Sequence, residues 1–113
     1  MSDSDLELVR GTLDLILLKA LAWGPSHGLG VARWIETTTD RQLVVEEGAL
    51  YPALHRLEQK RLLSSEWGLT DQNRRAKYYR LTERGRTHLA SEVRRWSRYT
   101  AAVARILAAE GAT

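Results

Sequence analysis

The chain contains no cysteine among its 113 residues, which excludes disulfides and thiolate metal sites. Its three histidines, His27, His55 and His88, lie far apart and lack the spacing of metal ligands. No nucleophile–base pair, paired carboxylates or glycine-rich phosphate loop stands out in the sequence. The sequence therefore predicts neither an enzyme nor a resident metal or cofactor.

Long apolar runs are also missing, because no stretch approaches the ~20 residues that span a bilayer. The first residues, 1–5, are acidic and lack the basic start of a signal peptide. We therefore expect a cytoplasmic protein with no membrane partner. The length leaves room for one domain with one extension.

The net charge of +3 is unevenly distributed along the chain. Residues 1–55 hold four basic and eight acidic side chains, whereas residues 56–113 hold thirteen basic and six acidic ones. Six basic residues fall between positions 74 and 86, against the single acid Glu83: Arg74, Arg75, Lys77, Arg80, Arg84 and Arg86. This pattern favours a phosphate-contacting patch over its alternative, a solvated charged face.

The most informative stretch covers residues 48–60. Four apolar side chains recur at helical spacing and predict a core-facing stripe: Leu50, Ala53, Leu54 and Leu57. The opposite face is polar, aromatic and mildly basic, and it carries Gly48, Tyr51, Pro52, His55, Arg56 and Gln59. Such a face suits a DNA major groove, although an ordinary amphipathic surface helix remains the alternative. Because proline belongs in the first turn, we expect the helix to begin near Gly48.

Two helices are predicted before this stretch. The first covers residues 12–23 and is ended by Gly24-Pro25, and the second covers 27–37 with Ser26 as its N-cap. A short strand is expected over 42–45. Three tryptophans in these and later segments are predicted to lie in the core: Trp23, Trp34 and Trp67.

A β-hairpin with a basic tip is predicted after the 48–60 helix. Residues 62–67 and 77–81 have strand composition, and a polar loop over 68–75 separates them. Three helices followed by such a hairpin, or wing, indicate a winged helix-turn-helix fold. The predicted fold class is mainly α (α+β), with a DNA-binding domain over 1–82 and a long C-terminal dimerisation helix within 83–113.

That C-terminal helix, capped by Thr82, carries a heptad seam. Six residues recur at alternating spacings of four and three: Leu89, Val93, Trp96, Thr100, Val103 and Leu107. A small domain cannot cover a seam of this length, so the pattern favours a twofold homodimer over a helix folded back on its own domain. Paired Trp96 indoles could sandwich a flat aromatic ligand, and interface packing is the alternative role.

Four segments make the chain resemble the PadR family of bacterial transcription regulators, and its short-chain subgroup in particular. They are residues 11–18 (GTLDLILL), 24–28 (GPSHG), 47–58 (EGALYPALHRLE) and 74–82 (RRAKYYRLT) with Gly85. The resemblance implies a winged-helix repressor that dimerises through its C-terminal helix, and some members respond to small aromatic effectors. Leu29 stands where the family usually has tyrosine, and the C-terminal helix is single and short.

We therefore expect a regulator, acting as a repressor, that binds a pseudo-palindromic DNA operator as a homodimer through helix 48–60 and wing 68–77. The residues expected to contact DNA are Gly48, Tyr51, Pro52, His55, Arg56, Gln59, Arg74, Arg75, Lys77 and Tyr79. Tyr78 and Tyr79 alternate faces, and the sequence leaves open which of them faces DNA. Two alternatives are a ligand-gated sensor of aromatic compounds with its site at the dimer seam, and a winged helix used for protein contacts.

Overall fold

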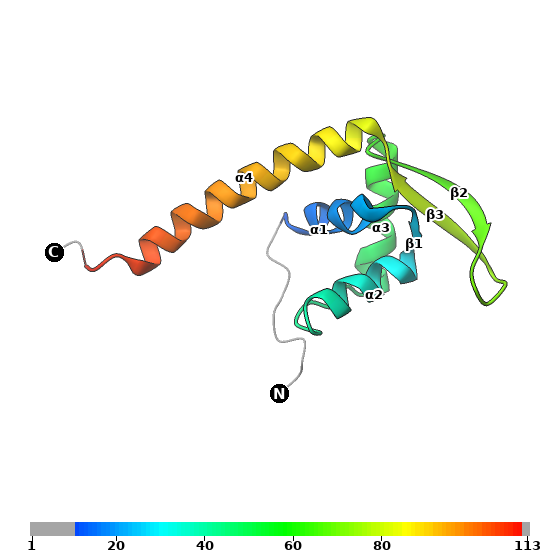
Figure 1. Ribbon diagram of the computed structural model, residues 1–113, viewed down its shortest axis with the longest axis horizontal. Helices are drawn as coiled ribbons and strands as arrows, with labels where there is room; N and C mark the ends of the chain where they lie inside the picture. Colours follow the sequence, from blue (N-terminus) through cyan, green and yellow to red (C-terminus); the bar gives the residue numbers. More distant parts are fainter. Residues whose placement is uncertain (1–10, 112–113) are drawn as a thin grey trace.

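The computed structural model describes residues 11–111, so the first ten residues of the predicted DNA-binding domain lie outside the described part. Its elements, shown in Figure 1, are α1 (Leu13–Ala20), the 3₁₀ turn η1 (Leu21–Trp23), β1 (Ser26–His27), α2 (Gly28–Thr38), α3 (Glu47–Gln59), β2 (Leu63–Leu69), β3 (Arg75–Leu81) and α4 (Glu83–Ala108). This is a winged helix-turn-helix, which confirms the predicted fold class.

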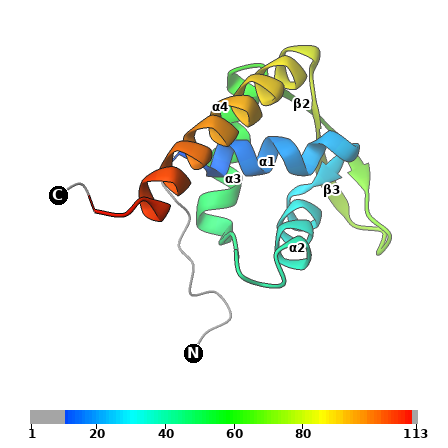
Figure 2. The ribbon, with the colours of Figure 1, turned by 60° about the vertical axis from the view of Figure 1, so that its left-hand side comes forward.

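The core lies between α1, α2, α3 and the base of the β2–β3 hairpin (Figures 1 and 2). The predicted α3 stripe is confirmed, because Leu50, Ala53, Leu54 and Leu57 are all at most 1% exposed. The other fully buried side chains come from each of the remaining core elements: Leu17, Leu18, Leu21, Val31, Ile35 and Leu63. Apolar periodicity thus places α3 with one face in the core and the other in solvent.

The sheet has three antiparallel strands in the order β1-β3-β2. The two-residue strand β1 pairs Ser26 with Tyr79 and His27 with Tyr78, and it was not predicted because two residues show no alternation. The wing strands are longer than predicted, so the turn at the tip covers only residues 70–74. Asn73 has φ 60° there, a left-handed conformation that asparagine tolerates well.

Two helix starts have side-chain caps. The predicted cap of α4 is confirmed, because Thr82 Oγ1 accepts the Gly85 N–H at 2.9 Å. The predicted cap of α2 is wrong by one residue: His27 Nδ1, not Ser26, accepts the Gly30 N–H at 3.1 Å.

Three further expectations are wrong. Residues 42–45 form no strand; instead Thr39 Oγ1 accepts the Leu43 N–H at 3.1 Å, which holds the chain in an irregular turn after α2. Trp23 and Trp67 are 73% and 62% exposed rather than buried, whereas Trp34 is half-buried against the core. Both exposed indoles lie beneath cations, Lys19 for Trp23 at 5.2 Å and Arg75 for Trp67.

Helix α4 extends away from this core (Figures 1 and 2), and the described chain measures 62 × 37 × 21 Å. Only Gly85 and Leu89 of its 26 residues are buried. Gly85 permits the helix start to pack closely, because a Cβ there would lie 2.0 Å from the Leu62 carbonyl oxygen. Among residues 11–111, no helix combines the length and apolar composition needed to cross a lipid bilayer.

Candidate nucleic-acid interface

The outward face of α3 carries the predicted set of polar and aromatic side chains. Gly48, Tyr51, Pro52, His55 and Gln59 are all exposed, opposite the buried leucine stripe. The helix begins at Glu47, one residue before the predicted start, so Pro52 lies in the second turn rather than the first. A proline there donates no hydrogen bond to the Gly48 carbonyl, and no atom lies within 4 Å of where a Gly48 Cβ would stand. The N-terminal half of α3 therefore offers an open, small-residue surface.

Tyr51 is held in place by the start of α2. A Cβ on Gly28 would lie 2.5 Å from Tyr51 Cε1 and 2.9 Å from Cζ, so the ring rests directly on the glycine backbone. The side chain nevertheless stays 44% exposed. The absence of a side chain at Gly28 thus lets Tyr51 pack closely against the start of α2 while part of its side chain stays exposed.

Arg56 lies on the flank of the same helix but points to another element. Its guanidinium donates a hydrogen bond to the Asp14 carboxylate of α1, and the two side chains are 48% and 33% exposed. This ion pair docks α3 on α1 over a sequence separation of 42 residues. The arrangement favours a structural role for Arg56 over the predicted DNA contact.

The strand register explains why apolar side chains are exposed on the wing. Pairing of Leu63 with Leu81, Ser65 with Tyr79, Trp67 with Lys77 and Leu69 with Arg75 puts these eight side chains on one face of the hairpin. The first pair is buried in the core, whereas Trp67 and Leu69 are each 62% exposed farther out. The core-facing side of the hairpin therefore continues beyond the core as an apolar and basic surface.

The two predicted arginines differ in their positions on the wing. Arg74 lies in the tip turn, where its N–H donates to Thr70 Oγ1 at 3.2 Å, and its side chain is exposed. Arg75 begins β3, and its guanidinium carbon lies 4.9 Å from the centre of the Trp67 ring. Cation–π contact of this kind orders an arginine before it meets an anion.

Tyr79 does not fit its predicted place among the DNA-contacting residues. Its side chain is only 5% exposed, and burial raises the pKa of its phenol. Tyr78 is half-buried on the other face, where its hydroxyl donates to the Leu69 carbonyl at 3.0 Å and its ring meets His27 edge-on at 5.4 Å. Tyr79 is therefore the inward-facing residue of the pair.

Lys77 is also engaged within the protein. Its Nζ lies 3.2 Å from Glu58 Oε1 and 5.7 Å from the centre of the Tyr79 ring. The Ser65 hydroxyl donates to the other oxygen of the same carboxylate. The Ser65 hydrogen bond, assisted by Lys77, lowers the pKa of Glu58 despite the opposing effect of burial. Lys77 is thus oriented toward α3.

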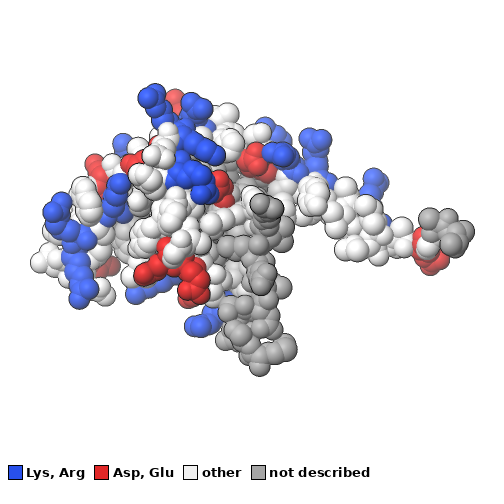
Figure 3. All heavy atoms as spheres, turned by 180° about the vertical axis from the view of Figure 1, so that it is seen from behind, with Lys and Arg blue, Asp and Glu red and all other residues white. Residues whose placement is uncertain are grey.

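An open cleft of about 500 Å³ separates the wing from α2 and α3. Five of the residues expected to contact DNA line it, namely Tyr51, Arg74, Arg75, Lys77 and Tyr79, together with His27, Gly28, Arg33 and Trp67. The sequence did not point to Arg33 and Trp67 as part of this surface, because Arg33 lies on a helix with no basic cluster and Trp67 resembles a core residue. From behind the view of Figure 1, Lys and Arg side chains gather at the wing and along the top of the molecule (Figure 3).

The predicted seam on α4 is largely uncovered. Val93, Trp96 and Leu107 are 40%, 37% and 80% exposed, and Thr100 and Val103 are half-buried. Leu89 is the exception, because it belongs to the core of its own domain. Two residues outside the predicted seam, Tyr99 and Ile106, are also exposed, at 62% and 73%.

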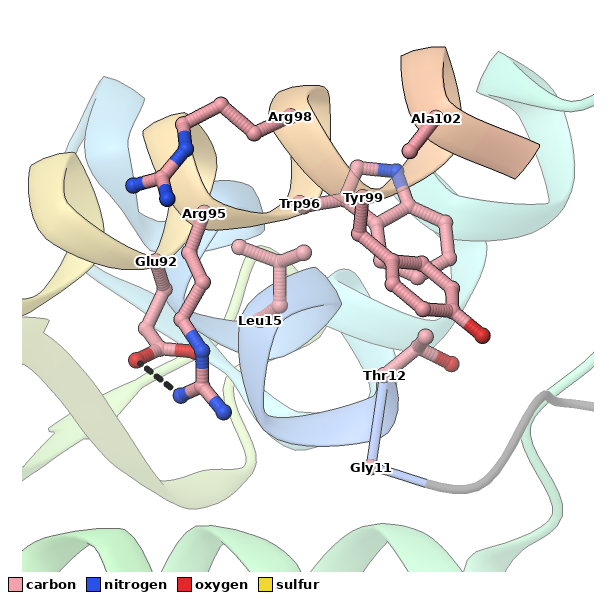
Figure 4. A pocket seen from close by; sticks show the side chains of 9 residues that line it. All are labelled: Gly11, Thr12, Leu15, Glu92, Arg95, Trp96, Arg98, Tyr99 and Ala102. Atoms are coloured by element: carbon pink, nitrogen blue, oxygen red, sulfur yellow. Dashed lines mark hydrogen bonds and ion pairs between the residues drawn. The ribbon is translucent and has the colours of Figure 1, made fainter. Parts of the chain in front are cut away.

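Trp96 also lines an open hollow of about 800 Å³ between α4 and the start of α1. Trp96 and Tyr99 lie beside each other there, with ring centres 6.1 Å apart, above Thr12 (Figure 4). Arg98 and Arg95 line the other end, and Arg95 is bonded to Glu92 at 3.4 Å.

Comparison with known proteins places this geometry in a family. The model of the transcriptional regulator PadR-like family matches residues 17–91. A transcriptional regulator from Clostridium thermocellum is 30% identical, with 85% of this chain and 93% of that chain covered and a TM-score of 0.77. A PadR family transcriptional regulator from Eggerthella lenta is 31% identical over 89% of this chain and 86% of that chain, with a TM-score of 0.74.

A protein of Lysinibacillus sphaericus is 29% identical over 91 residues, which cover 80% of this chain and 84% of that one. The matched segment 17–91 contains α2, α3, the wing and the first part of α4, so it includes the candidate interface. The chain therefore belongs to the PadR-like family of transcriptional regulators and is a DNA-binding regulator.

Proposed function

We propose that this protein binds a pseudo-palindromic operator as a homodimer and represses transcription from it. The observation that carries the proposal is the cleft, whose walls are the basic wing on one side and the start of α2 with Tyr51 of α3 on the other. In this arrangement α3 enters the major groove, and the wing lies on the neighbouring phosphate backbone. Repression, rather than activation, follows from the family resemblance.

We assign direct DNA contact to Tyr51, His55 and Gln59 on the exposed face of α3 and to Arg74 and Arg75 of the wing. Of these residues, Tyr51 and the two arginines line the cleft. All five side chains are exposed, which leaves them accessible to a duplex. Gly48 and Pro52 contribute a surface that DNA can approach closely. We no longer assign DNA contact to Arg56 and Lys77, because each forms an ion pair with an acidic residue of the protein itself.

The uncovered stripe of α4 supports the homodimer. A lone chain would leave Val93, Trp96 and Leu107 in water along a helix of 26 residues. Pairing two such stripes about a twofold axis removes them from solvent and sets two α3 helices on one side of the dimer. Half-sites should then lie about one helical turn of DNA, roughly 34 Å, or a multiple of it apart.

The wing's role is tested by replacing both Arg74 and Arg75 with alanine and measuring operator affinity against salt concentration. Each arginine that neutralises a phosphate adds ~0.9 to the salt slope, so removal of two arginines from each subunit of a dimer should lower the slope by roughly 3.6. The matched control is Arg94→Ala with Arg105→Ala, which removes the same charge from exposed positions on α4 outside the basic cluster of residues 74–86. Equal effects of the two double variants would remove the wing from the mechanism and leave only general electrostatic attraction.

A second candidate function is sensing of a flat aromatic compound at the α4 seam. The observation that favours it is the open hollow beside Trp96 and Tyr99 (Figure 4). Planar aromatic compounds should then quench tryptophan fluorescence, and Trp96→Ala should abolish the quenching. Trp23→Phe is the control, because it removes an indole that does not line the hollow. Quenching that survives Trp96→Ala would contradict a seam site.

A further inference from the structure

The acidic side chain of Glu58 lies between α3 and the wing, next to Lys77 of the cleft, where a carboxylate opposes DNA binding. Glu58 is the second-last residue of α3 and follows His55 by one helical turn. Its negative charge is unfavourable twice over, because it faces the negative end of the helix dipole and lies close to where phosphates would bind. Because the charge of Glu58 is unfavourable for both the helix and DNA binding, we expect Glu58 to have a compensating role.

The partners of Glu58 supply that role. One carboxylate oxygen accepts from Ser65 of β2, and the other lies 3.2 Å from Lys77 of β3. Ser65 and Lys77 are diagonal neighbours on the same face of the hairpin, because Ser65 pairs with Tyr79 and Trp67 with Lys77. Glu58 therefore bonds both wing strands to the recognition helix at once.

The position of the Glu58 contact along the hairpin allows it to fix the direction of the outer part of the wing. On the core side, Tyr79 and Leu63 are buried, and on the outer side Trp67 and Leu69 are exposed. The Glu58 contact thus lies where the hairpin leaves the core. The Glu58 side chain is 26% exposed and that of Lys77 is 35% exposed, so solvent screens the pair only in part.

We propose that Glu58 is a positioning residue that clamps the wing at a fixed angle to α3, and that Lys77 serves this clamp and not a phosphate. The inference rests on the proposed function, since it concerns how two DNA-contacting elements keep their spacing. A fixed spacing favours an operator that fits both elements, whereas a loose wing meets any DNA equally well. The negative charge of Glu58 thus weakens general attraction to DNA, whereas its bonds to the wing favour binding to a specific operator.

The clamp and simple electrostatics predict opposite signs for Glu58→Ala. Removal of a carboxylate, with release of Lys77, should strengthen binding to every DNA if charge alone matters. The clamp predicts that operator affinity falls roughly tenfold while affinity for random duplex stays equal or rises. Glu47→Ala is the matched control, because it removes the same charge from an exposed position at the other end of α3.

A double-mutant cycle separates positioning from general damage. The effect of Glu58→Ala on operator binding should vanish once Arg74 and Arg75 are alanine, because the clamp acts through them. Ser65→Ala, which leaves every charge in place, should weaken operator binding in the same direction. Tighter operator binding by Glu58→Ala, or an equal loss with and without the wing arginines, would overturn the clamp.

A measurement without DNA keeps this test independent of the proposed function. Amide hydrogen exchange in the free protein should become faster across residues 65–77 in Glu58→Ala, because the hairpin opens more often. Exchange in α1 and α2 should stay at the wild-type rate, which also shows that the variant is folded. Unchanged exchange in the hairpin would refute the clamp even if the wild type binds its operator, and faster exchange would support it even if no operator is found.

Discussion

The contact between Gly28 and Tyr51 offers the sharpest single-residue test of the interface. Gly28 is the first residue of α2, and its φ lies outside the left-handed region. Alanine is therefore compatible with the backbone and, as a better helix former, should stabilise α2 by up to ~1 kcal/mol. The added methyl group would nevertheless lie 2.5 Å from Tyr51 Cε1 and 3.0 Å from its hydroxyl oxygen.

Because Tyr51 is 44% exposed, we expect its ring to move rather than the backbone of α2. An off-rotamer side chain costs about 0.5–1.5 kcal/mol. In a dimer with two half-sites the loss doubles to ~1–3 kcal/mol, which corresponds to a roughly 5- to 150-fold weaker operator complex. Gly28→Ala should therefore weaken DNA binding while the melting temperature stays close to that of the wild type, because the helix gain and the rotamer cost are of similar size.

The assay is a fluorescence-anisotropy titration of a labelled operator, combined with thermal unfolding of the free protein. Tyr51→Ala serves as the background for a double-mutant cycle, because Gly28→Ala should have no further effect once the ring is gone. Wild-type affinity in Gly28→Ala would show that Tyr51 does not meet DNA. An equal loss in the Tyr51→Ala background would show that Gly28 acts in another way.

Three further predictions concern the dimer, the α4 joint and the clamp. Leu107→Asp should dissociate the dimer in sedimentation experiments, whereas Ala101→Asp, on another face of α4, should not; dissociation by both would count against the seam. Gly85→Ala should lower the free energy of unfolding by about 1–3 kcal/mol, measured by urea titration, because its Cβ would meet the Leu62 carbonyl oxygen at 2.0 Å. The pKa of Glu58 is lowered from 4.5, so its stabilising effect is present above pH 4.5 and disappears as the pH falls through its folded-state pKa. The difference in melting temperature between wild type and Glu58→Gln should shrink accordingly below pH 4.5, and a constant difference would contradict the assignment.

The sequence was sufficient to predict the elements whose signal is local. Helical spacing of Leu50, Ala53, Leu54 and Leu57 located α3 and its exposed face, and the Thr82 cap located the start of α4. The heptad pattern likewise included the exposed residues Val93, Trp96 and Leu107, although its first member, Leu89, belongs to the core. Helical periodicity and helix capping involve residues only a few positions apart, so both can be recognised in the sequence without knowledge of the tertiary structure.

The sequence could not predict contacts that depend on how separate helices and strands pack against one another. The pairing of Arg56 with Asp14 and of Glu58 with Lys77 joins residues on different elements, and composition alone made both cations resemble phosphate contacts. Tyr79 faces inward only because β1 and β2 flank β3 in one particular register. Trp67 resembles a core residue until the hairpin is seen to extend beyond the core.

Specific DNA recognition by a twofold dimer is the central claim, and selection of bound sequences from random duplex DNA tests it most directly. Purified protein would be used at ~0.15 M salt, where general electrostatic binding is weak. We expect enrichment of an inverted repeat whose half-sites are separated by about one turn of DNA or a multiple of it. Binding that is sensitive to salt but enriches no sequence would contradict the claim, and would instead favour a winged helix used for contacts with other proteins.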